Sequence, residues 1–153
     1  MNKDFNTYYF AFGSNMNVER VKERKVNFIQ RIPASIKDYK LVFDKKASGK
    51  PGNTFANIQP QDNSVVEGAL YLIDQESLKK LDVVEGVPVH YLRKEIEVNT
   101  NTGEKVKAWV YVANGDLLAS GKPSRDYLGH LLAGSDLLSN DYYEQLFKVS
   151  TLG

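Results

Sequence analysis

The sequence contains no cysteine and only two histidines among its 153 residues. Without cysteine it forms no disulfide, thiolate metal site or cysteine nucleophile. His90 and His130 lie in unrelated contexts without ligand spacing, so a zinc site is not expected, and each is interpreted as a surface or half-buried imidazole. Ser14 lies at a turn, but no G-x-S-x-G pattern surrounds it, which argues against serine catalysis.

The sequence also lacks an excess of charge of either sign. The 20 lysines and arginines are balanced by 19 aspartates and glutamates, which leaves a net charge of +1 and no general electrostatic reason to bind nucleic acid or an acidic membrane. No apolar run is long enough to span a membrane, and the first residues do not resemble a signal peptide, so a cytoplasmic location is expected. An apolar content of 42% and a length of 153 residues predict one folded domain, residues 1–153.

Apolar alternation and turn residues predict the order of the elements. Asn17 and Asp74 are expected to cap helices, Gly86 to end the second of these, and the polar stretch 44–53 to form a surface loop. The predicted strands cover residues 8–12, 34–43, 55–59, 65–73, 93–98 and 105–113, and the later predicted helices cover 75–86, 124–133 and 139–147. This order predicts an α+β fold with a mixed, mostly antiparallel curved sheet or small β-barrel and flanking helices.

The segment "YYFAFGSNM", residues 8–16, ends a strand in small polar residues. Gly13, Ser14 and Asn15 stand between this strand and a helix start, where exposed backbone amides and the helix dipole favour an anion. An ordinary turn capped by Asn15 or Asn17 explains the same residues. The glycine and lysine spacing of a mononucleotide-binding loop is absent.

Glu85, within "KKLDVVEGVPVHY", is flanked by valines on both sides. A carboxylate in apolar surroundings has a raised pKa, which suits a general base. An exposed glutamate at the end of a helix is the alternative. The sequence also leaves two interpretations of Tyr91 and Tyr127, a site residue or a packing residue, because tyrosines often fill a core edge with the hydroxyl in water.

Four segments in this order resemble the γ-glutamylcyclotransferase-like proteins, from about Tyr8 to about Leu146. They are "YYFAFGSNM", "VVEGALYLI", "LDVVEGVPVHYLRKEIEV" and "PSRDYLGHLLAGSDLLSNDYYEQL". The family signature is an aromatic-Gly-Ser-Asn loop and a Glu-Gly pair after a short helix. Phe12 stands where the family usually has tyrosine, and residues 44–53 have no clear family match.

The resemblance implies an enzyme that releases 5-oxoproline from a γ-glutamyl amino acid, peptide or amine. Glu85 matches the catalytic glutamate of the family, and the implied substrate-binding residues are Phe12, Gly13, Ser14, Asn15, Met16, Tyr91 and Tyr127. Arg20 matches an arginine interpreted as a brace for the loop. The implied partner is a small γ-glutamyl molecule, with no metal, cofactor, nucleic acid or membrane, and the protein is expected to be a monomer or homodimer. A non-catalytic module that binds a γ-glutamyl-like ligand or a partner segment is the alternative.

Overall fold

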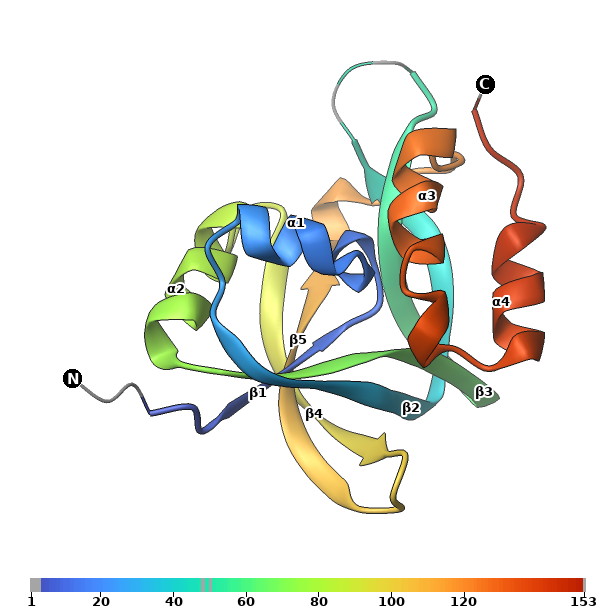
Figure 1. The fold of residues 1–153 in the computed structure, drawn as a ribbon. Coiled ribbons are helices and arrows are strands. Elements are labelled where there is room, and N and C mark those ends of the chain that lie inside the picture. The colour runs from blue at the N-terminus through green and yellow to red at the C-terminus, as the bar shows by residue number, and fades with distance from the viewer. Residues whose placement is uncertain (1–3, 48, 50, 153) are drawn as a thin grey trace.

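The computed structural model describes residues 4–47, 49 and 51–152. Its strands form a closed barrel in the order β1-β3-β2-β4-β5 (Figure 1). All neighbouring strands are antiparallel except β1 and β5, which run parallel and close the barrel. The strands are β1 (Thr7–Ala11), β2 (Phe28–Lys46), β3 (Thr54–Ile73), β4 (Tyr91–Thr100) and β5 (Lys105–Ala113). The predicted α+β class with a small, mostly antiparallel barrel is confirmed.

The helices flank the barrel on two sides (Figure 1). They are α1 (Val18–Glu23), α2 (Gln75–Val84), α3 (Arg125–Leu132) and α4 (Asn140–Phe147), with single 3-10 turns at η1 (Ser14–Met16), η2 (Gly115–Leu117) and η3 (Ser135–Leu137). The expected caps are present, since the Asn17 side chain accepts from the Glu19 amide and the Asp74 side chain accepts from the Ser77 amide. Among the residues that the structure describes, no helix has the length and apolarity needed to cross a membrane.

Successive side chains along the strands enter two separate cores, as the two-residue period of a strand requires. Phe10 and Leu70 pack in a core that also receives leucines of α3 and α4. Their neighbours Tyr9 and Tyr71 pack in a second core with residues of α1 and α2. The rings of these two tyrosines stack with their centroids 5.8 Å apart. Strand β1 therefore contributes to both cores just before it reaches the loop that follows it.

Strand β3 is continuous over 20 residues, so the prediction of two strands at 55–59 and 65–73 was wrong. The polar residues between them resemble a turn in sequence, but Pro60 and Val65 on either side pair with Tyr39 and Lys37 of β2, and residues 61–64 lie in an irregularity of the register. Asp38 and Asn63 both adopt positive φ angles, 64° and 65°, beside an irregularity in the register, and the Asn63 amide donates to the Asp38 carboxylate at 3.0 Å. A bulge shared by two strands thus replaces the expected break.

Strand β2 is also longer than predicted, and its end includes part of the segment 44–53 that was expected to be a loop. Lys46 pairs with Thr54 of β3, and the preceding Lys45 is only 2% exposed. Pairing with a distant strand therefore overrides the polar composition of this segment. Residues 48 and 50 of the expected loop lie outside the described residues.

Gly68 of β3 lies against the end of β1, next to the residue that pairs with Ala11. A Cβ atom at this position would collide with the Ala11 carbonyl oxygen and would lie 2.8 Å from the ring of Phe10. We expect Gly68→Ala to lower the free energy of unfolding by about 1–3 kcal/mol, because the added methyl group forces the two strands apart. Urea denaturation followed by circular dichroism measures this change.

Gly129→Ala in α3 is the matched control, because nothing lies within 4 Å of a Cβ built there. This variant should gain roughly 0.5–1 kcal/mol from the better helix propensity of alanine. Equal unfolding midpoints for Gly68→Ala and the parent protein would show that the close approach of β1 to β3 is not a constraint on the fold.

Candidate active site

The loop after β1 leaves several backbone donors unused. The Met16 amide donates to the Gly13 carbonyl at 3.0 Å, and the Asn17 amide donates to the Ser14 carbonyl at 3.1 Å, which forms the single turn η1. Within residues 4–47, 49 and 51–152, no partner is found for the amides of Gly13, Ser14 and Asn15. Three neighbouring N–H groups are thus available to a ligand at the point where the chain enters α1.

The Asn15 side chain holds this loop in place. It is 2% exposed, its amide donates to the Tyr9 hydroxyl at 2.8 Å, and its carbonyl oxygen accepts from Arg24 Nη1 at 2.7 Å. Its backbone carbonyl accepts from the Tyr71 hydroxyl at 2.8 Å. Because its polar groups bind other parts of the protein, this side chain positions the loop.

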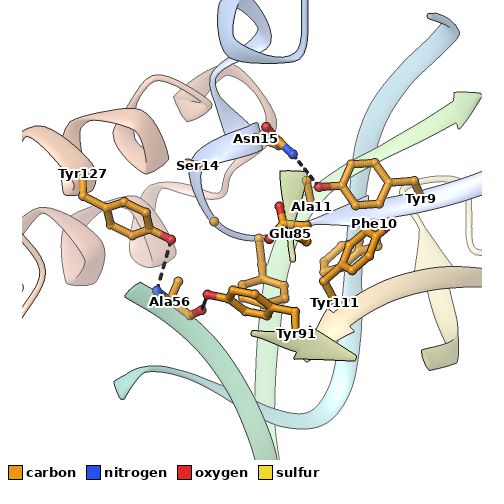
Figure 2. A pocket seen from close by; sticks show the side chains of 12 residues that line it. Tyr9, Phe10, Ala11, Ser14, Asn15, Ala56, Glu85, Tyr91, Tyr111 and Tyr127 are labelled. Atoms are coloured by element: carbon orange, nitrogen blue, oxygen red, sulfur yellow. Dashed lines mark hydrogen bonds between the residues drawn. The ribbon is translucent and has the colours of Figure 1, made fainter. Parts of the chain in front are cut away.

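Two tyrosines are fixed by one residue of β3 on the other side of the site (Figure 2). The Tyr127 hydroxyl oxygen accepts from the Ala56 amide at 3.1 Å, and the Tyr91 hydroxyl donates to the Ala56 carbonyl at 2.9 Å. Burial raises the pKa of both tyrosines above the usual range, so both stay protonated. Since Tyr127 uses its oxygen as an acceptor, its hydroxyl hydrogen is available to a ligand. A Cβ at Gly13 would lie 3.1 Å from this hydroxyl, so the absence of a side chain at Gly13 lets the Tyr127 hydroxyl lie close to the loop.

Glu85 is the C-terminal cap of α2, directly after its last residue Val84. Its amide donates to the Leu81 carbonyl at 2.8 Å, and Gly86, with a φ of 65°, turns the chain away and ends the helix as predicted. The Glu85 side chain is 19% exposed and points toward the loop and the tyrosines (Figure 2). The Arg24 guanidinium lies 4.0 Å from its carboxylate, which is the limit of an ion pair. Glu85 is therefore a sheltered carboxylate without a close counter-ion.

Burial raises the pKa of Glu85, and this effect outweighs the opposing effect of three cations. Arg24, Arg20 and Lys45 each favour the charged carboxylate and lower the pKa in that order. A carboxyl group with a raised pKa accepts and returns a proton more readily near neutral pH than an exposed one. The arrangement therefore suits a general acid and base.

These groups line two adjoining cavities, which are named the inner and the outer cavity below. The inner cavity, about 40 Å³ in volume, is lined by Tyr9, Phe10, Ala11, Phe12, Gly13, Ser14, Asn15, Ala56, Glu85, Tyr91, Tyr111 and Tyr127 (Figure 2). The outer cavity, about 310 Å³, shares Ser14, Glu85, Tyr91 and Tyr127 with it and adds Arg20, Arg24, Lys45, Lys46, Phe55, Val84 and His90. In the described part of the chain, no group of three or more histidine, aspartate or glutamate side chains could hold a metal ion.

The structure brings most of the predicted site residues to the inner cavity. The inner cavity is lined by Glu85 and by six of the predicted substrate-binding residues, which are Phe12, Gly13, Ser14, Asn15, Tyr91 and Tyr127. Met16 is the exception, because its side chain is 1% exposed in the core between the barrel and α2. Its amide also donates to the Gly13 carbonyl, so Met16 offers no free backbone donor to a ligand. A turn of this kind must use one amide to close itself.

Several residues of the site were not predicted from the sequence, or were predicted in another role. Arg20 was expected to brace the loop, but it contacts His130 at 3.3 Å, and Arg24, about one helical turn later, binds Asn15. Tyr9, which lines the inner cavity, and Lys45, which lines the outer one, are not among the predicted site residues. Tyr9 carries a weak signal, since it lies in an aromatic-rich strand shortly before the loop, although Tyr8 beside it has the same signal. No local signal marks Lys45, which follows from the unexpected length of β2.

Comparisons with known proteins agree with this geometry. A profile of the family described as γ-glutamyl cyclotransferase, AIG2-like, matches residues 9–129. The chain belongs to this family. The mouse protein named γ-glutamylcyclotransferase is 28% identical over 144 residues, which cover 90% of this chain and 76% of that protein. The family predicted from the sequence motifs is confirmed, and it is an enzyme family.

Two further relatives support the assignment. A Methanocaldococcus jannaschii protein, whose name provisionally assigns it the same activity, is 32% identical over 75 residues. That segment covers 47% of this chain and 62% of the archaeal protein. A solved structure titled γ-glutamyl cyclotransferase superposes with a TM-score of 0.84 at 25% identity and covers 95% of this chain and 89% of that one. The barrel is therefore the fold of the family over nearly the whole chain.

The contacts of Asn15 give a prediction about stability. Asn15→Ala removes the partner of the Tyr9 hydroxyl and of the Arg24 guanidinium in a buried setting. The free energy of unfolding should fall by about 1–3 kcal/mol, measured by urea denaturation, because buried polar groups lose their hydrogen bonds. Asn101→Ala, at an exposed position between β4 and β5, is the control and should change it by less than about 0.5 kcal/mol. Equal effects of the two substitutions would contradict the positioning role of Asn15.

Proposed function

We propose that this protein is a γ-glutamylcyclotransferase that releases 5-oxoproline from γ-glutamyl compounds. One observation carries the proposal: the sheltered Glu85 carboxylate and the three unpaired amides of Gly13, Ser14 and Asn15 line the same small cavity. These residues are far apart in sequence, so nothing local makes them neighbours. A folded γ-glutamyl group is short enough to contact both at once.

In the proposed reaction the substrate supplies its own nucleophile. The α-amine attacks the γ-carbonyl carbon, a new carbon–nitrogen bond closes a five-membered ring, and the bond to the departing amine breaks. Since both reacting groups belong to one molecule, the enzyme mainly fixes a folded conformer, and such positioning is worth several kcal/mol. The cavity between the loop and Ala56 provides the walls for that conformer.

Glu85 moves the protons in this proposal. An α-amino group has a reference pKa of roughly 8 in model peptides and is largely protonated at neutral pH, so a base must remove a proton before attack. The raised pKa of Glu85 makes its carboxylate a stronger base than an exposed glutamate. The same carboxyl group then returns a proton to the nitrogen of the departing amine, which balances the reaction without a further reagent.

The neutral donors of the cavity bind the oxygen atoms of the substrate. The amides of Gly13, Ser14 and Asn15 are proposed to hold the α-carboxylate or the oxyanion that develops on the γ-carbonyl. The free hydroxyl hydrogen of Tyr127 is a further donor at the edge of the same cavity. Tyr91 and Phe12 contribute the surrounding walls. Met16 is proposed to act only through packing, because its amide is occupied.

Glu85→Gln tests the role of the carboxylate. The substitution retains the size of the side chain but removes its capacity to accept a proton. Release of 5-oxoproline from a panel of γ-glutamyl compounds should fall on the order of a hundredfold or more, whereas substrate affinity measured by calorimetry should largely persist. Glu95→Gln, an exposed glutamate of β4, should turn over like the parent protein.

The panel also separates an enzyme from a binding module. Parent protein that binds γ-glutamyl compounds and releases no 5-oxoproline would have the alternative function of a non-catalytic module. Full activity of Glu85→Gln would assign the proton transfer to another group. The sheltered position of Glu85 favours the enzyme, because ligand binding alone does not require a buried base.

The charges around Glu85 give a prediction for the pH profile. Activity should fall as the pH falls through the pKa of Glu85, because the base form is lost. Arg24→Gln removes a cation that lowers this pKa, so the pKa should rise further and the acidic limb should move to higher pH. Arg24→Lys retains the charge, so the acidic limb of the pH profile should lie near that of the parent protein. Arg125→Gln, at an exposed position of α3, should not shift this limb. A shift of the acidic limb to lower pH in Arg24→Gln would contradict the assignment of Glu85 as the base.

A further inference from the structure

The backbone carbonyls of residues 13–16 all have hydrogen-bond donors, in contrast to the amides of the same loop. The first two carbonyls accept from the amides that close η1. The Asn15 carbonyl accepts from the Tyr71 hydroxyl at 2.8 Å, and the Met16 carbonyl accepts from Arg31 Nη2 at 3.0 Å. The acceptors of the loop are therefore bound within the protein, whereas three of its donors have no partner among the described residues.

The Arg31 side chain, which comes from β2, contacts three parts of the structure at once. Besides the bond to the Met16 carbonyl, its Nε donates to the Tyr71 hydroxyl at 3.2 Å and its Nη1 donates to the Asp136 carboxylate at 2.7 Å. Because an arginine N–H can only donate, the Tyr71 hydroxyl accepts from Arg31 and directs its own hydrogen to the Asn15 carbonyl. Arg31 thus binds one loop carbonyl directly and orients the group that binds the preceding one.

Asp136 of η3 is the counter-ion of Arg31. The hydrogen bond from Arg31 holds the pKa of Asp136 below its usual range, so this carboxylate is charged at neutral pH. The turn before η3 also lies close to the loop, since a Cβ at Gly134 would lie 2.5 Å from Met16 Cε. The Arg31 side chain is only 12% exposed, and a planar guanidinium with a partner at each nitrogen has little freedom to turn. Arg31 is therefore a rigid support for the loop.

Arg31 lies behind the loop and does not reach the cavities. Neither Arg31 nor Asp136 is among the described residues that line the inner or the outer cavity. Arg31 is also not among the three cations that lower the pKa of Glu85. Any effect of Arg31 on the reaction must therefore pass through the loop.

We propose that Arg31 is a positioning residue for the cyclotransferase reaction. Through the Met16 carbonyl and the Tyr71 hydroxyl, it fixes the end of the loop that directly follows the unpaired amides, and these amides are thereby held toward the inner cavity. Asp136 supports this role by holding the guanidinium in place. The proposal rests on the proposed function, because the loop donors matter to catalysis only if they bind an oxygen of the substrate.

Arg31→Met and Tyr71→Phe test the proposal with the γ-glutamyl compound that the parent protein turns over best. Arg31→Met removes the donors and keeps an unbranched side chain, whereas Tyr71→Phe removes only the hydroxyl. The kcat/KM of Arg31→Met should fall on the order of ten- to a hundredfold, because displaced donors bind the substrate oxygens poorly. Tyr71→Phe should show a smaller fall. The double variant should lose less than the product of the two effects, since both substitutions act on one loop.

The pH profile separates positioning of the loop from a direct effect on the base. The acidic limb of Arg31→Met should lie at the pH of the parent protein, because Arg31 does not lower the pKa of Glu85. Arg31→Lys retains a donor for the Met16 carbonyl but cannot bind all three partners, so it should recover part of the lost kcat/KM. A rise in KM alone would assign the loop amides to the α-carboxylate of the substrate, and a fall in kcat alone would assign them to the oxyanion.

Ser139→Ala is the control for a general loss of stability. The Ser139 hydroxyl donates to the Glu67 carboxylate at 2.7 Å and accepts from the Tyr142 amide as the N-cap of α4, a helix that lines neither cavity. This variant should be less stable but should retain the kcat/KM of the parent protein at a temperature at which both are folded. Hydrogen exchange of the two amides that close η1 should be faster in Arg31→Met and unchanged in Ser139→Ala.

The outcomes separate the positioning role from the proposed function. Parent-like kcat/KM in Arg31→Met and Tyr71→Phe, or an equal fall in Ser139→Ala, would overturn the positioning role and leave the cyclotransferase activity intact. A displaced acidic limb in Arg31→Met would overturn it too, because Arg31 would then act on the charge of Glu85. If the parent protein releases no 5-oxoproline from any γ-glutamyl compound, the proposed function fails and the positioning role fails with it. A lower kcat/KM with an unmoved limb and faster exchange in η1 would support the role of Arg31.

Discussion

The hydrogen bonds of the Asn15 side chain hold together the elements on which the site depends. One bond leads to Tyr9 in β1 and the other to Arg24 at the end of α1, which in turn faces Glu85 at the end of α2. A loop with three unpaired amides has little internal structure of its own, so its shape must come from such external contacts. The buried amide of one residue thereby fixes the distance between the loop donors and the carboxylate.

The Glu85 carboxylate lies near three cations but forms no close ion pair with any of them. A close ion pair would stabilise the carboxylate and lower its pKa by one to three units, which would weaken it as a base. Complete isolation would instead protonate it at neutral pH. Arg24 at 4.0 Å, with Arg20 and Lys45 acting more weakly, offsets part of the effect of burial while the pKa stays raised. Side chains from α1, its C-terminal cap and β2 thus adjust the pKa of the residue that caps α2.

The sequence predicts those parts of the fold and site that depend on local chemistry. Gly86 ends α2 through its positive φ, so the position of Glu85 at a helix end follows from the glycine. The neighbours of Glu85 depend instead on pairing between distant strands. Lys45 reaches the site because β2 continues into a segment whose composition resembles a loop. Arg24 and Arg20 lie on one short helix, and only the packing of that helix decides which of them meets Asn15.

The division of donors between the two cavities has a physical reason under the proposed mechanism. A carboxylate is bound most strongly by lysine or arginine, yet the inner cavity offers the substrate only neutral amides and hydroxyl groups. A further cation in that confined space would act on Glu85 at short range and lower the pKa that makes it a base. Neutral N–H donors bind the α-carboxylate with a smaller effect on this pKa. The cations line the outer cavity instead, where Arg24, Arg20 and Lys45 lower the pKa of Glu85 less than burial raises it.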